Sequence, residues 1–282
     1  MGLTAFFLAV LLTSVGAGMV GAILGLGGGI LLVPILTMFY GVDLHYAMGA
    51  SIISVIATSS GAAAAYLKTG LSNVRIGLFL VLATITGAIT GATLSGVVPA
   101  RWLELILGLA LGYSTFVTIK QLHVELPGPA PREWLATRFG LEGTYHDFLA
   151  GEDVSYRATR VGRGFAAMYA AGVLSGLLGI GSGAFKVLAM DNLMRLPMKV
   201  STATSNFMIG ITAAASAGIY FTRGDIQPLV VAPVAIGVLG GAYLGTVVMA
   251  RMRNTTLRKV FLPIVVYLAL SMVWRSFGIH LR

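Results

Sequence analysis

Lys186 and two glycine clusters are the features of this sequence that point most directly to chemistry. The clusters are Gly25-Leu26-Gly27-Gly28-Gly29 and Gly179-Ile180-Gly181-Ser182-Gly183, and both interrupt strongly apolar stretches. Lys186 follows the second cluster by three residues in an otherwise apolar setting. Glycine weakens a helix and allows backbone conformations that other residues avoid, so each cluster is predicted to break a helix, and close packing between unbroken helices is the alternative. The amides at the start of the helix that follows, with a lysine beside them, would bind an anion.

Hydroxyl and amide side chains that suit an oxyanion follow both clusters. They are Ser51, Ser54, Thr58 and Ser59 in the first half, and Ser201, Thr202, Thr204, Ser205, Asn206 and Thr212 in the second. Such residues are also ordinary helix contacts in membranes, and this alternative stays open. The predicted substrate-binding set is Gly27, Gly28, Gly29, Ser51, Gly181, Ser182, Gly183, Lys186, Ser205 and Asn206.

Two ionisable side chains in the second half have alternative interpretations. A lysine buried in a membrane is costly, so Lys186 should face a cavity, an anion or Asp191, or else extend its ammonium to the interface. Asp191 lies five residues further on, a poor helical spacing for a direct pair. Its carboxylate is the candidate for proton coupling, and a structural pairing is the alternative.

Enzyme and metal chemistry find little support in the sequence. There are no cysteines, and the four histidines, at positions 45, 123, 146 and 280, have no ligand-like spacing. Ser182 between two glycines superficially suggests a nucleophile, but activation needs a base, and the only histidine downstream is at position 280. We expect no metal, no cofactor and no enzymatic activity.

The composition indicates a polytopic membrane protein. Of 282 residues, 57% are hydrophobic and 10% charged, whereas about 25% of a soluble domain is charged. Eight stretches are long and apolar enough to cross a bilayer: 3–24, 44–67, 76–98, 102–119, 164–180, 200–221, 226–250 and 260–274. Segments 30–40 and 184–194 are apolar but half that length. The first stretch is expected to remain as a helix, because no lysine or arginine precedes it. A net charge of +9 predicts contact with lipid headgroups rather than nucleic acid.

The sequence repeats with an offset of 154 residues, which superimposes the two glycine clusters. The offset also pairs Ser51 with Ser205, Tyr66 with Tyr220, Gly87 with Gly241 and Gly91 with Gly245. We expect the last two pairs to be sites of close helix packing.

The predicted organisation is a membrane repeat over 1–119, a hydrophilic connector over 120–163 and a second membrane repeat over 164–282. Within the connector, residues 131–135 are predicted to begin a short helix, and residues 145–157 to form a small hairpin that turns near Ala150-Gly151.

Charge distribution favours repeats of opposite orientation. If each half crosses the membrane five times, the second half is inverted, and 14 of the 19 lysines and arginines lie on the cytoplasmic side with four outside. Parallel halves would give 11 inside and seven outside. The predicted fold is therefore an all-α polytopic membrane protein with two inverted repeats, each a glycine-broken helix pair plus three further spans. Both termini are predicted outside the plasma membrane, and the connector in the cytoplasm.

The run G-L-G-G-G-I-L-L-V-P from Gly25 to Pro34 and its echo G-I-G-S-G-A-F-K from Gly179 to Lys186 resemble the paired signature of the sulfite exporter TauE/SafE family. The T-A-T-S-N run from Thr202 to Asn206 fits as well. The resemblance implies an integral permease for small sulfur-containing anions such as sulfite, sulfonates or thiosulfate, with proton coupling as an option. An anion channel, or a transporter of another oxyanion or a carboxylate, is the alternative. The sequence does not define the oligomeric state.

The two halves depart from each other at the paired motif. Lys186 stands where the first half has Leu32, and Ser182 stands where it has Gly28. The two halves of the predicted site are therefore chemically unequal.

Overall fold

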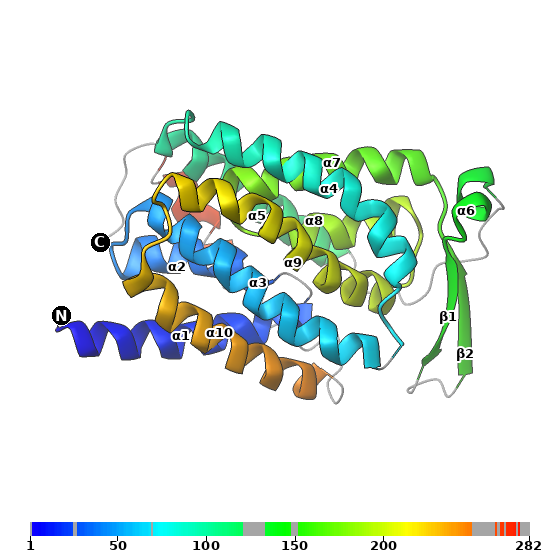
Figure 1. Ribbon diagram of the computed structural model, residues 1–282, viewed down its shortest axis with the longest axis horizontal. Helices are drawn as coiled ribbons and strands as arrows, with labels where there is room; N and C mark the ends of the chain where they lie inside the picture. The colour runs from blue at the N-terminus through cyan, green and yellow to red at the C-terminus, as the bar shows by residue number, and fades with distance from the viewer. Residues whose placement is uncertain are drawn as a thin grey trace.

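The computed structural model describes residues 2–24, 27–68, 70–120, 133–147 and 152–249, and beyond these 263, 266–267, 269–274 and 276. The helices of the first half are α1 (Leu3–Leu24), α2 (Gly29–Phe39), α3 (Leu44–Lys68), α4 (Val74–Ser95) and α5 (Ala100–Lys120). Those of the second half are α7 (Val161–Leu178), α8 (Gly183–Leu188) with its π-helical continuation η2 (Ala189–Leu193), α9 (Met198–Thr222) and α10 (Pro228–Met249). Figure 1 shows them as one elongated bundle.

Helices break at both glycine clusters, as the sequence predicts. α1 ends at Leu24 and α2 begins at Gly29, and α7 ends at Leu178 and α8 begins at Gly183, each 154 residues later. Gly28 before α2 has φ 68°, and Ser182 before α8 has φ 47°, so both breaks use the left-handed region. Gly25 and Leu26 of the first cluster lie outside the described residues.

The offset of 154 residues also relates the remaining helix bounds. Leu44–Lys68 of α3 corresponds to Met198–Thr222 of α9, and Val74–Ser95 of α4 to Pro228–Met249 of α10. The packing of the helices is related in the same way. α1 packs on α10, and their counterparts in the other half, α7 and α4, pack on each other. Two hydrogen bonds repeat as well. Tyr66 Oη donates to the Ala22 carbonyl at 3.0 Å, and Tyr220 Oη donates to the Gly176 carbonyl at 2.6 Å.

Corresponding helices run in opposite directions along the bundle. In Figure 1, α1, α3 and α10 run away from the end that carries the N-terminus, and α4, α7 and α9 run back towards it. Side by side at the centre, α3 and α9 are therefore antiparallel. The backbone N–H of Asn73, which lies between α3 and α4, donates to Thr204 Oγ1 near the start of α9 at 3.0 Å. At the other end, Gly49 of α3 lies against the Asp225 backbone just past α9.

Glycines let the helix pairs approach to backbone contact. A Cβ on Gly87 or Gly91 of α4 would overlap the α7 backbone, and one on Gly241 or Gly245 of α10 would overlap the α1 backbone. This confirms the interpretation of these four glycines as sites of helix packing, where small residues allow backbones to meet closely.

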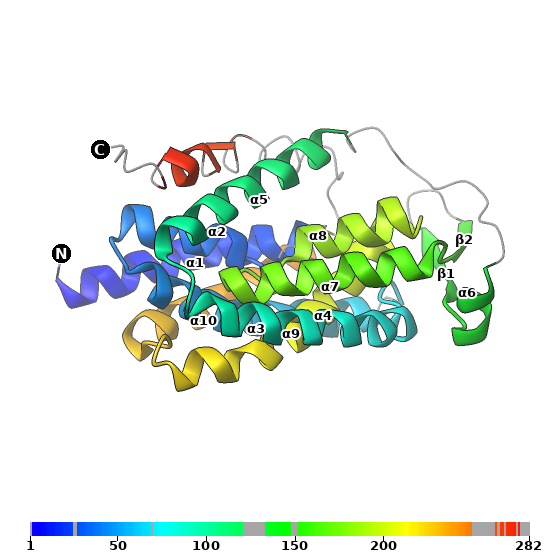
Figure 2. The ribbon, with the colours of Figure 1, turned by 90° about the horizontal axis from the view of Figure 1, so that it is seen from above.

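Five helices of the described chain are long and apolar enough to cross a membrane: α1, α3, α4, α7 and α10. These helices make the chain a multi-pass membrane protein. Seen from above in Figure 2, α5 lies along one side of the bundle, with the described helical residues after 262 next to it. Gly108 of α5 contacts Val273 there, and Tyr113 of α5 stacks on Phe185 of α8 with ring centroids 6.0 Å apart.

The connector forms a small lobe at one end of the bundle (Figure 1). It contains α6 (Trp134–Phe139) and an antiparallel hairpin of β1 (Glu142–Asp147) and β2 (Glu152–Arg157), with Glu142 opposite Arg157. The predicted hairpin is therefore present and begins three residues earlier than expected. Its predicted turn at Ala150-Gly151, and Pro131-Arg132 before α6, lie outside the described residues.

Asn73 joins this lobe to the membrane helices. Its Nδ2 donates to Tyr156 Oη at 3.0 Å and to the Glu142 carbonyl at 3.3 Å. Burial raises the pKa of the Tyr156 phenol, and the hydrogen bond from Asn73 opposes this in part. The lobe is thus packed on the bundle through Asn73.

Candidate functional site

The two helix breaks meet in the middle of the bundle. Val55 of α3 and Ile209 of α9, which occupy corresponding positions 154 residues apart, both lie where a Cβ on Gly27 or Gly181 would meet them. Both side chains are fully buried, as are the residues of the two breaks that the structure describes. The bundle therefore brings the two predicted halves of the site together around a shared apolar contact.

Part of the first break satisfies its own backbone donors. The Gly29 amide donates to the Gly27 carbonyl at 2.7 Å, and the Gly27 amide donates to the Gly21 carbonyl at 3.3 Å. The Leu31 amide in turn donates to the Gly28 carbonyl at 3.1 Å. Since these amides are already paired, α2 presents fewer free donors to a ligand than its glycine content alone indicates.

Ser51 and Ser205 hold the second break in place. Ser51 Oγ donates to the Gly179 carbonyl at 2.6 Å, and Ser205 Oγ donates to the Gly183 carbonyl at 3.3 Å. Both serines are fully buried. They belong to α3 and α9, so the two central helices fix the ends of the helices that flank the second break.

Asn206 and Ser182 each bring an unpaired oxygen to this region. Asn206 Nδ2 donates to the carbonyls of Ala22 and Thr202 at 3.4 and 3.2 Å. Within the described chain, neither its Oδ1 nor Ser182 Oγ has a hydrogen-bond partner, although both residues are fully buried. Unpaired buried polar atoms are costly, and the same holds for the hydroxyls of Ser14, Ser72, Ser175 and Ser271 elsewhere in the described chain, so the lack of a partner does not by itself mark a ligand site.

Lys186 is fully buried on α8 and points its ammonium at a hydroxyl. Its Nζ donates to Thr212 Oγ1 of α9 at 3.0 Å. Thr212 Oγ1 in turn lies 2.9 Å from Thr84 Oγ1 of α4. Because the side chain has no exposed surface, Lys186 does not reach the interface, and that alternative for its environment is wrong.

The positive charge of Lys186 has no carboxylate beside it in the described part of the chain. None of the ion pairs there includes Lys186. Asp191, five residues along the chain in η2, is half-buried and does not pair with it. An ammonium has three donors, and Thr212 accepts only one of them.

Thr84 belongs to the candidate site through its contact with Thr212, and it was not predicted from the sequence because it lies in the middle of an apolar span. One signal could have found it. The corresponding position of the second half is Val238, so a hydroxyl stands here where the repeat has an isosteric apolar group. Leu32 and Lys186 show the same contrast.

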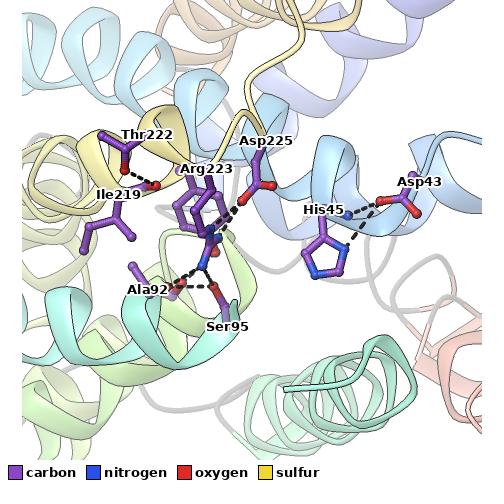
Figure 3. Close-up of polar contacts among 10 residues, drawn as sticks. Asp43, His45, Ala92, Ser95, Ile219, Thr222, Arg223 and Asp225 are labelled. Carbon is purple, nitrogen blue, oxygen red and sulfur yellow. Dashed lines mark hydrogen bonds and ion pairs between the residues drawn. The ribbon is translucent and has the colours of Figure 1, made fainter. Parts of the chain in front are cut away.

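A second polar cluster closes the end of the bundle where α4 and α9 end (Figure 3). Arg223 donates from Nε and Nη2 to Asp225 Oδ2 at 2.8 and 2.6 Å. Its Nη1 donates to the Ala92 carbonyl at 2.7 Å and to Ser95 Oγ at 2.9 Å. Its guanidinium carbon also lies 4.7 Å from the centroid of the Tyr220 ring. We call Arg223 with these contacts the Arg223 clasp.

The described residues hold no group of three or more histidines, aspartates and glutamates that could bind a metal ion. At the two breaks the serine hydroxyls and several backbone amides already donate within the protein, whereas the Lys186 ammonium has one partner and keeps donors that could recognise an anion.

Taken together, the apolar spans, the paired helix breaks and the buried cation define a multi-pass membrane protein with a polar site inside the bundle. The family model described as sulfite exporter TauE/SafE matches residues 10–272. The chain belongs to this family of membrane transporters.

Curated bacterial proteins are similar over most of the chain. YunE of Bacillus subtilis (strain 168), described as a probable membrane transporter protein, is 27% identical over 92% of this chain and 94% of its own length. YdhB of the same organism, with the same description, is 27% identical over 81% of this chain and 84% of its own. A probable membrane transporter protein of Xylella fastidiosa (strain 9a5c) is 26% identical over 95% of this chain and 97% of its own length. No solved structure matches the chain.

Proposed function

We propose that this protein transports small sulfur-containing anions, such as sulfite, sulfonates or thiosulfate, across the plasma membrane, most simply as an exporter. Lys186 is the observation that carries the proposal. It is a fully buried lysine whose side-chain nitrogen has one hydroxyl partner and, in the described part of the chain, no carboxylate beside it. Leaving such a charge uncompensated inside a membrane bundle is costly, and a bound anion would supply both the charge and the missing acceptors.

The arrangement of the helices supports alternating access around this site. The repeated helix bounds and the opposite directions of α3 and α9 are what two inverted repeats produce (Figure 1). Transporters built from inverted repeats bind substrate at discontinuous helices near the membrane midplane. Inverted repeats would place 14 of the 19 lysines and arginines on the side of the connector, which supports a cytoplasmic lobe and external termini.

Transport in proteoliposomes tests the proposal. Purified protein should carry radiolabelled sulfite or methanesulfonate with saturable kinetics, and Lys186→Met should lower the flux at least about tenfold, because one charged hydrogen bond to the ligand is worth about 1.5–3 kcal/mol. Lys199→Met is the matched control, since Lys199 lies at the start of α9 and is only half-buried. Wild-type flux in the Lys186 variant would remove this residue from the site.

The same preparation separates the alternatives. Large conductance without saturation would indicate an anion channel, and uptake of carboxylates in place of sulfur anions would indicate a different substrate class. For an intramembrane enzyme, Ser182 would need a base, yet its Oγ has no partner among the described residues. Proton coupling through Asp191 predicts that Asp191→Asn abolishes the response of flux to a pH gradient and leaves anion exchange intact.

A further inference from the structure

Lys186 is the only fully buried lysine or arginine among the residues that the structure describes. Asp225, in the Arg223 clasp, is the other charged residue in the buried class. The positions that correspond to Lys186 and Thr84 in the other half are Leu32 and Val238, both fully buried and apolar. The duplicated fold therefore contains one charged site per chain.

Thr212 and Thr84 add polarity to this site but no charge. Thr212 Oγ1 accepts from Lys186 and lies 2.8 Å from the Met208 carbonyl, to which its hydrogen is donated. Thr84 Oγ1 lies 3.0 Å from the Val81 carbonyl and 2.9 Å from Thr212 Oγ1, so its hydrogen also has an acceptor. The two remaining ammonium hydrogens of Lys186 are thus the free donors of this group, and they carry a single positive charge.

A single buried charge discriminates between ligands by their charge. An anion with one negative charge neutralises Lys186, so the occupied site is neutral inside the bundle. A doubly charged anion of similar size would leave one negative charge in a low-dielectric environment, where an unpaired charge is strongly disfavoured. None of the fully buried described residues could offset that second charge.

We propose that the Lys186 site selects singly charged oxyanions, of the sulfonate or hydrogensulfite kind, against doubly charged ones such as sulfate and thiosulfate. This inference rests on the proposed transport function and narrows it. The selection comes from charge matching at one ammonium. The Thr212 hydroxyl orients that ammonium, and the Thr84 hydroxyl contacts Thr212. Neither hydroxyl carries a charge that would distinguish ligands by their charge.

Competition in wild-type proteoliposomes tests the inference with two ligands that share a headgroup. Ethanesulfonate carries one charge, and ethane-1,2-disulfonate carries two. Ethanesulfonate should inhibit methanesulfonate flux at a concentration at least about tenfold lower than the disulfonate requires, and sulfate should behave like the disulfonate. Equal inhibition by the two sulfonates, or stronger inhibition by the disulfonate, would overturn charge selection while leaving the transport function in place. Failure of every anion to be carried or to compete would instead refute the transport function.

Thr84→Val provides the second measurement. The substitution removes a hydroxyl and no charge, so the ratio between the two inhibitory concentrations should stay within about threefold of wild type even if the affinity for both falls. Collapse of the ratio in this variant would assign the discrimination to the hydroxyls and would also overturn the charge argument.

Discussion

Replacing Arg223 by methionine should open the end of the bundle where α4 and α9 end. The Arg223 clasp joins Ala92 and Ser95 of α4 to Asp225, which follows α9 (Figure 3). Methionine keeps the length and much of the apolar surface of the side chain but removes all of these hydrogen bonds. Asp225 then remains mostly buried without its cation, which favours a conformation in which water reaches the carboxylate.

The size of this effect follows from the burial of the pair. Exposed ion pairs contribute up to about 1 kcal/mol, whereas breaking a buried pair costs about 3–5 kcal/mol. The Arg223 and Asp225 side chains have relative solvent exposures of 23% and 12%, so solvent screens the pair in part. Its contribution to stability therefore lies between that of an exposed pair and that of a buried pair. We take a value of about 2 kcal/mol, which corresponds to a rise of about 30-fold in the population of the open state.

Cysteine accessibility measures this population directly, because the natural sequence contains no cysteine. Ser95→Cys places a thiol of similar size at a fully buried position next to Arg223. Labelling of this thiol by a water-soluble maleimide should become about 30-fold faster when Arg223→Met is added. Asp225→Asn should accelerate it less, because Arg223 keeps its hydrogen bond to the Ala92 carbonyl of α4.

Arg138→Met is the control for these variants. Arg138 is exposed on α6, in the connector lobe at the other end of the bundle, and its removal should leave the labelling rate unchanged (Figure 1). A change of less than about threefold in the Arg223 variant would show that the clasp contributes less than about 0.7 kcal/mol. Equal acceleration by the control would show that the thiol reports general loosening of the bundle.

Two further predictions concern the helices that frame the site. Gly241→Ala should lower the free energy of unfolding by about 1–3 kcal/mol, because the methyl group meets the α1 backbone. Gly240→Ala is the control, and with open space around it the change should be neutral or stabilising by up to about 1 kcal/mol. Equal shifts of the melting temperature in detergent would contradict this prediction. Ser51→Ala should cost about 1–3 kcal/mol in the same assay because the buried Gly179 carbonyl loses its donor, and exposed Ser60→Ala should cost much less. A Ser51 variant as stable as the Ser60 variant would show that Gly179 finds another partner.

The local features of this protein could be predicted from its sequence. The apolar spans, the two helix breaks and the hairpin of the connector all depend on properties of neighbouring residues. Composition sets which segments enter a membrane, and clustered glycines set where a helix stops. The offset of 154 residues also predicts which helix bounds correspond, because a duplicated sequence folds into the same elements twice.

The contacts of the site were decided by tertiary structure. Thr84 belongs to a span that gives no sign of chemistry, and it reaches the site only because α4 packs against α9. Ser51, chosen from the sequence as a ligand-binding hydroxyl, donates to the Gly179 carbonyl in the other half of the chain.

The sequence by itself therefore determined which segments are apolar enough to cross a membrane and where the helices are interrupted. It left open whether Lys186 would be buried or would reach the interface, and the packing of α8 against α9 settled that question. The physical reason is the range of the forces involved. Helix breaks and membrane insertion depend on short segments, whereas the environment of one ammonium depends on side chains that only long-range packing brings together.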